Sequence, residues 1–232
     1  MRDLHAYTPE RAAPRRWARR TTTSPRPSVT SIANTGEMNT PGGVGRSSAR
    51  KYQGVPTDET VVVNANGTLA NVFVYVKSGL PASYTAPAPA GPVTLDQDGC
   101  RYHPHVLGIQ VGQTLAIKNS DGILHNIKAK AKANRPFNIS QPAVMTSTKT
   151  FDKPEVMVAL ECNVHGWMHA WLGVLPHPFF GVSGGDGSFA IKGLPPGTYT
   201  IEAWHEKYGT QTASVTVAGS ETKTADFSFA AK

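Results

Sequence analysis

Short apolar runs separated by turn residues constrain the fold of this 232-residue chain more than any other feature. Between residues 93 and 177 the runs occupy 102–111, 114–118, 124–130, 147–151, 156–162 and 170–175. Glycine, proline, asparagine and aspartate lie between them, and no amphipathic stretch of ten residues interrupts them. This spacing is typical of an antiparallel β-sandwich. We therefore predict an all-β fold.

The segments on either side of this region predict a second, smaller set of strands. Runs at 61–64 and 72–77 are separated by Asn66-Gly67, a strong hairpin signal. Residues 79–92 are rich in proline and alanine and predict an extended connector. After residue 178 the strands are short and half polar, and a segment of this size buries little apolar surface alone. We expect it to need the strands at 59–77.

Charge is concentrated at the N-terminus. Residues 1–51 hold ten of the 23 Lys and Arg and three of the 16 Asp and Glu, so the net charge of +7 lies there and residues 52–232 are neutral. Nucleic-acid binding needs a concentrated basic face, so we expect no nucleic-acid partner for the folded part. Residues 1–55 lack apolar periodicity and predict a disordered basic tail.

Neither a transmembrane segment nor a signal peptide is predicted from the sequence. No run of 18 apolar residues is present, so no transmembrane segment is predicted. No signal peptide is readable near the N-terminus, because the stretch from Arg11 to Arg20 is basic and broken by Pro14.

The chemistry is concentrated in the stretch Cys162-Asn163-Val164-His165-Gly166-Trp167-Met168. It places a thiol, an imidazole and a thioether directly after a strand-like run. A soft thiolate, an imidazole and a weak thioether together suit copper, whereas zinc sites rarely use a thioether. A trigonal centre needs a second imidazole, and His125, which follows the turn at 119–124, is the best candidate.

Residues 93–177 resemble the cupredoxins, and within them the plastocyanin and amicyanin branch. The resemblance rests on the run 110–121 with its Gly112 turn, then on His125-Asn126, and then on Cys162, His165 and Met168 in that family's order and spacing. It implies a Greek-key β-sandwich and one type 1 (blue) copper ion per chain, with these two histidines and the cysteine in the trigonal plane and the methionine axial.

The same resemblance implies a function and a set of neighbouring residues. It implies one-electron transfer between redox protein partners rather than enzymatic turnover, and a periplasmic or extracytoplasmic location. The family anchors its two ligand loops together, which points to Asn126 with Asn163 as its partner. Val164 stands where plastocyanin and amicyanin carry proline, so its N–H is predicted to donate to the Cys162 sulfur and to raise the reduction potential. The predicted electron exit patch lies around His165 and consists of Trp167, Trp171 and Leu124.

A second resemblance concerns the end of the chain. Asp186-Gly187-Ser188-Phe189 and Leu194-Pro195-Pro196-Gly197-Thr198-Tyr199 resemble the carboxypeptidase regulatory-like, transthyretin-like β-sandwich module. In that module a strand similar to residues 71–76 comes first. We therefore predict that residues 56–92 and 178–232 form one small sandwich, into which the cupredoxin domain at 93–177 is inserted.

Other readings stay open. Cys100 is interpreted as a structural cysteine in preference to a second thiolate ligand. The remaining histidines are interpreted as surface or core residues; they include His103, His105, His169, His177 and His205. The alternative function is a copper-binding or delivery protein, or a cell-surface interaction module, without redox cycling. Oligomeric state is not predicted.

Overall fold

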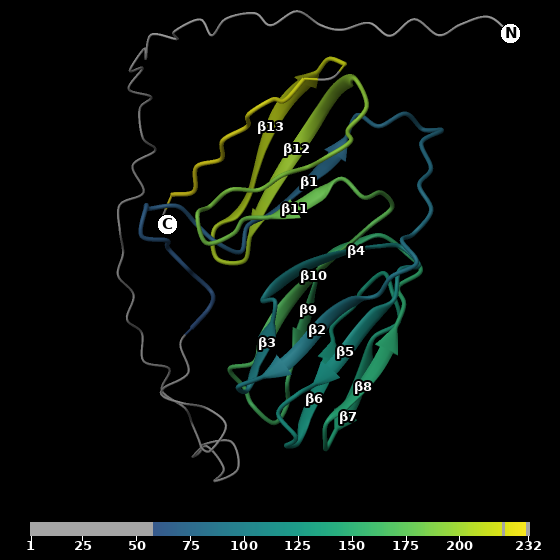
Figure 1. Cartoon of the computed structure of the whole chain (residues 1–232), viewed down its shortest axis with the longest axis vertical. Helices are drawn as coiled ribbons and strands as arrows, with labels where there is room; N and C mark the ends of the chain where they lie inside the picture. Colours follow the sequence, from purple (N-terminus) through teal and green to yellow (C-terminus); the bar gives the residue numbers. More distant parts are fainter. Residues whose placement is uncertain (1–57, 220, 231–232) are drawn as a thin grey trace, which may run out of the picture.

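Every regular element that the computed structural model describes is a β-strand (Figure 1). The structure describes residues 58–219 and 221–230. The strands are β1 (Phe73–Ser78), β2 (Val93–Asp98), β3 (Arg101–His103), β4 (Val106–Gln110), β5 (Leu115–Asn119), β6 (His125–Ala129), β7 (Phe137–Gln141), β8 (Met145–Lys149), β9 (Glu155–Glu161), β10 (His169–Leu175), β11 (Phe180–Val182), β12 (Gly197–His205) and β13 (Gly209–Val217). The predicted all-β class is confirmed, whereas the predicted disordered tail at 1–55 lies outside the described residues. Over the described ranges, no helix of the length and apolarity needed to cross a membrane is found.

Strands β2 to β10 form the larger sandwich, which consists of two sheets packed face to face. One sheet has the order β4-β10-β9-β6-β7 and the other the order β3-β2-β5-β8. Alternate side chains of each strand enter the shared core. Leu95 and Ile117 come from the four-stranded sheet and Ile109, Ile127 and Leu172 from the five-stranded sheet, and all are 0% exposed. This core fixes the strand ends from which the functional loops emerge.

The sequence predicts an antiparallel sandwich, but two strand pairs of the larger sandwich are parallel. Strand β2 pairs in parallel with β5, and β4 pairs in parallel with β10. The chain crosses between the two sheets after β3 and again after β4, so β5 returns to the first sheet in the direction of β2. Run lengths and turn residues show where strands begin and end, but they do not show on which sheet the next strand lies. The direction of pairing was therefore predicted wrongly for these two pairs.

The smaller sheet combines segments from both sides of the larger sandwich. Its order is β11-β1-β12-β13, with all neighbours antiparallel. Strand β1 precedes the larger sandwich in the sequence, whereas β11, β12 and β13 follow it (Figure 1). This is the pairing that an inserted domain requires, and we retain boundaries at residues 92 and 177 as a proposal. The predicted hairpin after Asn66-Gly67 is limited to a bridge between Val63 and Leu69, because β1 pairs with β11 and β12 instead.

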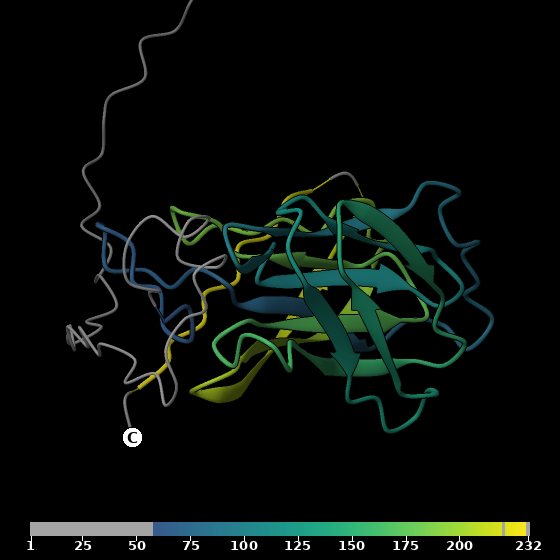
Figure 2. The ribbon, with the colours of Figure 1, turned by 90° about the horizontal axis from the view of Figure 1, so that it is seen from below.

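The two faces of β1 pack against different partners. Val74 and Val76 enter the core of the smaller sheet, whereas Phe73 and Tyr75 face the larger sandwich. Gly108 of β4 and Gly173 of β10 are directly paired; a Cβ atom on Gly173 would collide with the Phe73 ring, and one on Gly108 with the rings of Phe180 and Phe73. The missing side chains therefore let β1 approach β4 and β10. Figure 2, viewed from below, shows the larger sandwich in front of the smaller sheet.

Candidate metal centre

Three strand ends meet at one end of the larger sandwich. His125 is the first residue of β6, Cys162 follows β9 directly, and Met168 directly precedes β10. Strands β6 and β9 are antiparallel neighbours, with Lys128 opposite Glu161. The start of β6 therefore lies beside the loop that leaves β9. Backbone pairing alone thus brings the separate ligand segments to the same place.

The predicted nitrogen and sulfur ligands converge there. His125 Nδ1 lies 2.9 Å from His165 Nδ1, and Cys162 Sγ lies 3.8 Å from His165 Nδ1. His125, Cys162 and His165 are 0%, 4% and 3% exposed. We call these three residues, together with Met168, the first centre. Its donor atoms are gathered in a site from which bulk water is excluded.

The arrangement fits a trigonal metal ion. Two ligands at typical metal–nitrogen and metal–sulfur lengths in a trigonal plane are separated by about 3.8 Å, and two such nitrogens by about 3.5 Å. The sulfur-to-nitrogen distance of 3.8 Å matches this expectation. The shorter distance between the rings, 2.9 Å, is that of a hydrogen bond. A proton shared by these two nitrogens and a metal ion bound to both would compete for the same lone pairs.

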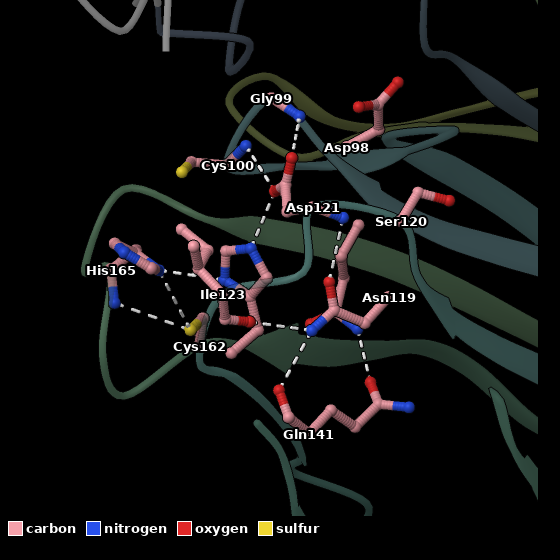
Figure 3. Close-up of polar contacts among 12 residues, drawn as sticks. Asp98, Gly99, Cys100, Asn119, Ser120, Asp121, Ile123, Gln141, Cys162 and His165 are labelled. Carbon is pink, nitrogen blue, oxygen red and sulfur yellow. Dashed lines mark hydrogen bonds and ion pairs between the residues drawn. The ribbon is translucent and has the colours of Figure 1, made fainter. Parts of the chain in front are cut away.

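Asp121 sets the tautomer of His125. Its Oδ2 lies 2.7 Å from His125 Nε2, and a carboxylate only accepts hydrogen bonds, so Nε2 carries the proton and Nδ1 presents a lone pair. The same carboxylate accepts the N–H groups of Gly99 at 2.7 Å and Cys100 at 2.8 Å. Figure 3 shows Asp121 between Gly99 and Cys100 on one side and the side chains of Cys162 and His165 on the other. A carboxylate that orients a histidine in this way is a frequent partner of metal sites.

Asn119 holds the turn that carries Asp121. Its side chain is fully buried and donates to the carbonyl groups of Ile123 at 2.8 Å and Gln141 at 2.9 Å. Its Oδ1 accepts the N–H of Asp121 at 3.0 Å (Figure 3). The turn before His125 is therefore fixed by side-chain hydrogen bonds on both sides.

The sulfur of Cys162 has the character of a thiolate. Burial opposes ionisation, but hydrogen bonds from His125 and His165 outweigh burial and lower the pKa of Cys162 to about 5. Burial likewise opposes the imidazolium form of His125, whereas hydrogen bonds to Cys162 and Asp121 raise its pKa. A metal cation bound at the site would likewise favour the thiolate over the thiol.

The two ligand loops are joined through Asn126, as the family resemblance implies. Its Oδ1 accepts the backbone N–H of Asn163 at 2.5 Å, and its Nδ2 donates to Asn138 Oδ1 at 2.5 Å. Asn163 takes part through its backbone, so the replacement of a hydroxyl residue there does not break the link. The Cys162 sulfur accepts backbone N–H groups from His165, at 3.4 Å, and from Asn126, whereas donation from Val164 stays a prediction.

Met168 closes the ligand loop through its backbone. Its N–H donates to the carbonyl of His165 at 2.9 Å, and its own carbonyl accepts the N–H of Cys162 at 3.1 Å. The side chain is 2% exposed and packs in the same core cluster as Cys162. The loop is therefore a closed turn that places the methionine beside the cysteine. An axial role for the thioether stays a prediction.

The residues of the predicted exit patch lie in two different places. The Trp167 ring is 5.2 Å from the His165 ring, and Leu124 is 47% exposed. Trp171, in contrast, packs against Trp204 of the smaller sheet in a tilted arrangement, with ring centres 5.1 Å apart. Trp171 therefore lies between the two sandwiches and is not grouped with the other two.

Cys100 lies closer to the centre than the sequence suggests. Its sulfur and the ring nitrogens of His125 and His165 all lie within 4.8 Å of one another. Cys100 is fully buried with a φ of 55°, and neither cysteine forms a disulfide. Its backbone is held by Asp121 on one side and by Trp167, whose Nε1 donates to its carbonyl at 3.0 Å. A second thiol thus faces the same pair of imidazoles.

Comparison with known proteins gives one family match and several similar structures. Residues 180–230 match the family model of the carboxypeptidase regulatory-like domain, which confirms the second resemblance. No curated protein matches the chain by sequence. Similar solved structures include a copper-containing nitrite reductase (NirK) from Thermus scotoductus SA-01, at 24% identity and a TM-score of 0.34 over 42% of this chain. The match spans 25% of that reductase.

Cupredoxins are also among the similar structures. Amicyanin from Paracoccus versutus is 20% identical, with a TM-score of 0.33 over 44% of this chain and 96% of its own. A purple cupredoxin from Nitrosopumilus maritimus is 20% identical, with a TM-score of 0.30 over 35% of this chain and 97% of its own.

Proposed function

We propose that this chain is a mononuclear type 1 copper protein that transfers single electrons between redox partners. The observation that carries the proposal is the convergence of His125 Nδ1, His165 Nδ1 and Cys162 Sγ in a buried site, with contacts of 2.9 Å and 3.8 Å. Two imidazoles and one thiolate, with a buried methionine in the same loop, form a donor set typical of blue copper proteins. We propose that His125, Cys162, His165 and Met168 would hold the copper ion.

Electron transfer suits the way in which the protein holds these ligands. Asp121 fixes the ring of His125, and the hydrogen bond from Asn163 to Asn126 joins the two ligand loops. Copper, when bound, supplies the one-electron couple. A rigid set of ligands changes little between the two oxidation states, which keeps the barrier to electron exchange low. With four protein ligands no coordination position is left for a substrate, so we propose a carrier and not an enzyme.

We propose that electrons leave through His165 and Trp167, whose ring centres lie 5.2 Å apart. The exposed Leu124, next to His125 in the chain, offers apolar surface for brief contact with a protein partner. The partners are expected to be redox proteins. We place the chain outside the cytoplasm on the strength of the cupredoxin resemblance.

Visible spectroscopy of copper-loaded protein tests the proposal. The wild-type protein should show intense visible absorption from charge transfer between thiolate and Cu(II), and Cys162→Ser should abolish it. Cys100→Ser is the matched control, because it removes the other buried thiol, and it should keep the band. A colourless copper complex of the wild-type protein would refute electron transfer at a type 1 site. Loss of the band in Cys100→Ser alone would assign the thiolate ligand to Cys100.

The position of Cys100 favours one second candidate, a copper-binding or delivery protein without redox cycling. A second soft sulfur donor beside two imidazoles would stabilise Cu(I) over Cu(II). In that case the protein should bind Cu(I) tightly, remain colourless with copper, and lose Cu(I) affinity in Cys100→Ser as well as in Cys162→Ser.

A further inference from the structure

A second group of side chains that could bind a metal lies where the larger sandwich meets the smaller sheet. His105 precedes β4, His169 is the first residue of β10, and Glu206 follows β12 of the smaller sheet. One ligand atom from each lies within 4.8 Å of the other two. We call these three residues the interface cluster. From the sequence, both histidines are predicted to be ordinary surface or core residues.

The carboxylate of Glu206 is held between the two rings. Its Oε1 lies 2.6 Å from His105 Nε2, and its Oε2 lies 3.4 Å from His169 Nε2. Trp171 Nε1 donates to Oε2 at 2.7 Å and fixes the carboxylate in this position. The side chains of His105 and Glu206 are 2% and 8% exposed, and that of His169 is 28% exposed. The cluster is therefore buried on one side and open to water on the other.

The tautomer of His169 shows what the cluster lacks. Its Nδ1 lies 3.1 Å from the carbonyl oxygen of Trp167, which only accepts hydrogen bonds, so Nδ1 carries a proton. The neutral ring then presents the lone pair of Nε2 to the carboxylate of Glu206. Two lone-pair donors that face each other need a cation between them, either a proton or a metal ion.

His105 repeats this pattern. Its Nε2 faces Glu206, while its buried Nδ1 makes no hydrogen bond to the residues that the structure describes. That Nδ1 lies 4.0 Å from Oε2 of Glu59, a second carboxylate on the opposite side of the ring. A proton on Nδ1 would face Glu59 and leave the Nε2 lone pair directed at Glu206. Both rings can thus offer Nε2 to one ion without loss of their outer contacts.

We propose that His105 Nε2, His169 Nε2 and the carboxylate of Glu206 bind one divalent transition-metal ion, with Zn²⁺ the ion best suited to two imidazoles and a carboxylate. Water reaches the site past the half-buried His169 and completes the coordination. Two ligands belong to the larger sandwich and one to the smaller sheet, so the ion would link the larger sandwich to the smaller sheet. This site is independent of the proposed copper function, because it shares no ligand with the first centre.

Zinc counting by equilibrium dialysis of the full chain tests the proposal. The wild-type protein should retain one zinc ion more than Glu206→Gln and one more than His169→Gln. His103→Gln is the matched control, since this histidine is exposed, directs Nε2 toward the carbonyl of Asp98 and lies two residues from His105, and it should retain the wild-type count. The same difference of one ion should persist in a Cys162→Ser background, which separates this site from the first centre.

Thermal unfolding provides a second readout. Zinc at a hundredfold excess over its Kd should raise the Tm of the wild-type protein by roughly 5–10 °C, and should raise that of Glu206→Gln by less. Equal zinc counts in the wild-type protein and both variants would overturn the proposal. In that case a lower Tm of zinc-free Glu206→Gln would show that protonated histidines pair with Glu206 and that no metal is needed. Because His169 is partly exposed, His169→Gln keeps the test usable if Glu206→Gln fails to fold.

Discussion

The first centre and the interface cluster contain neighbouring residues, Met168 and His169, yet they are built differently. The first centre draws its ligands from the larger sandwich, and Asp121 and Asn126 hold it from the same sandwich. The interface cluster takes Glu206 from the smaller sheet and exists only while that sheet is docked. The first centre is therefore expected to survive changes in docking, whereas the interface cluster should report on them. Four substitutions test this difference.

Phe73→Ala should have the largest effect. The Phe73 ring is 0% exposed and lies between the two sandwiches, 5.7 Å from the Phe180 ring. Its removal should cost about 3–5 kcal/mol of unfolding free energy, measured by urea denaturation. Zinc affinity at the interface cluster should fall, while the visible copper band remains. Phe189→Ala, on the other face of the smaller sheet, is the control for loss of an aromatic ring. Loss of both metals in parallel would show that the two sites are not independent.

Gly173→Ala tests the same contact by adding atoms. A Cβ at this position collides with the Phe73 ring, so the two sandwiches must move apart. Overpacking of this kind should cost about 1–3 kcal/mol and should weaken zinc binding more than copper binding. Gly91→Ala is the control, since a Cβ there meets no atom within 4 Å. An unfolding free energy equal to that of the Gly91 variant would show that the interface accommodates the added methyl group at little cost.

Asp121→Asn should affect the first centre alone. The amide can donate to His125 Nε2 and so shift the ring proton to Nδ1, where it competes with the metal. Copper affinity, measured by competition with a chelator, should fall about 10–100-fold. Asp98→Asn, an exposed carboxylate in the neighbouring hairpin, should leave affinity unchanged. A zinc count reduced at the interface cluster would contradict the assignment of Asp121 to one site only.

Asn126→Ala should have the smallest effect. It removes the hydrogen bond that joins the ligand loops, and the exposed Asn163 can regain a bond to water, so the cost should be about 1 kcal/mol in urea denaturation. The copper band should persist with a shifted reduction potential. Asn138→Ala, which removes only the outer partner of Asn126, should leave the potential unchanged. A potential unaltered in both variants would mean that the loop link does not tune the metal.

The sequence predicts the ligand loop well because its chemistry is local. Cys162, His165 and Met168 lie within seven residues after a strand, so their spacing is enough to suggest a common site. The family resemblance adds His125. The role of Asp121 could not be predicted in the same way, because it depends on which ring nitrogen the carboxylate reaches. The only hint in the sequence is its position, four residues before His125 in the turn that follows a strand.

Features that depend on the packing of distant segments were missed. Cys100 reaches the imidazoles because a tight turn, with Gly99 and Cys100 both at positive φ, folds the β2–β3 hairpin over the site. The interface cluster consists of residues 105 and 169 of the larger sandwich and residue 206 of the smaller sheet. Similarly, Asn66-Gly67 marks a turn correctly but not the partner of the strand that follows it. Turn chemistry is local, whereas strand partners are selected by the whole fold.

The pairing of β1 with β11 has a consequence for the order of folding. Tyr75 lies opposite Phe180, so this short ladder closes a loop of about a hundred residues. In the unfolded chain that closure carries an entropic cost that three paired residues cannot offset. Once β2 to β10 have collapsed, their two ends lie close together and most of the cost has already been met. The smaller sheet should therefore assemble late, after the larger sandwich has become compact.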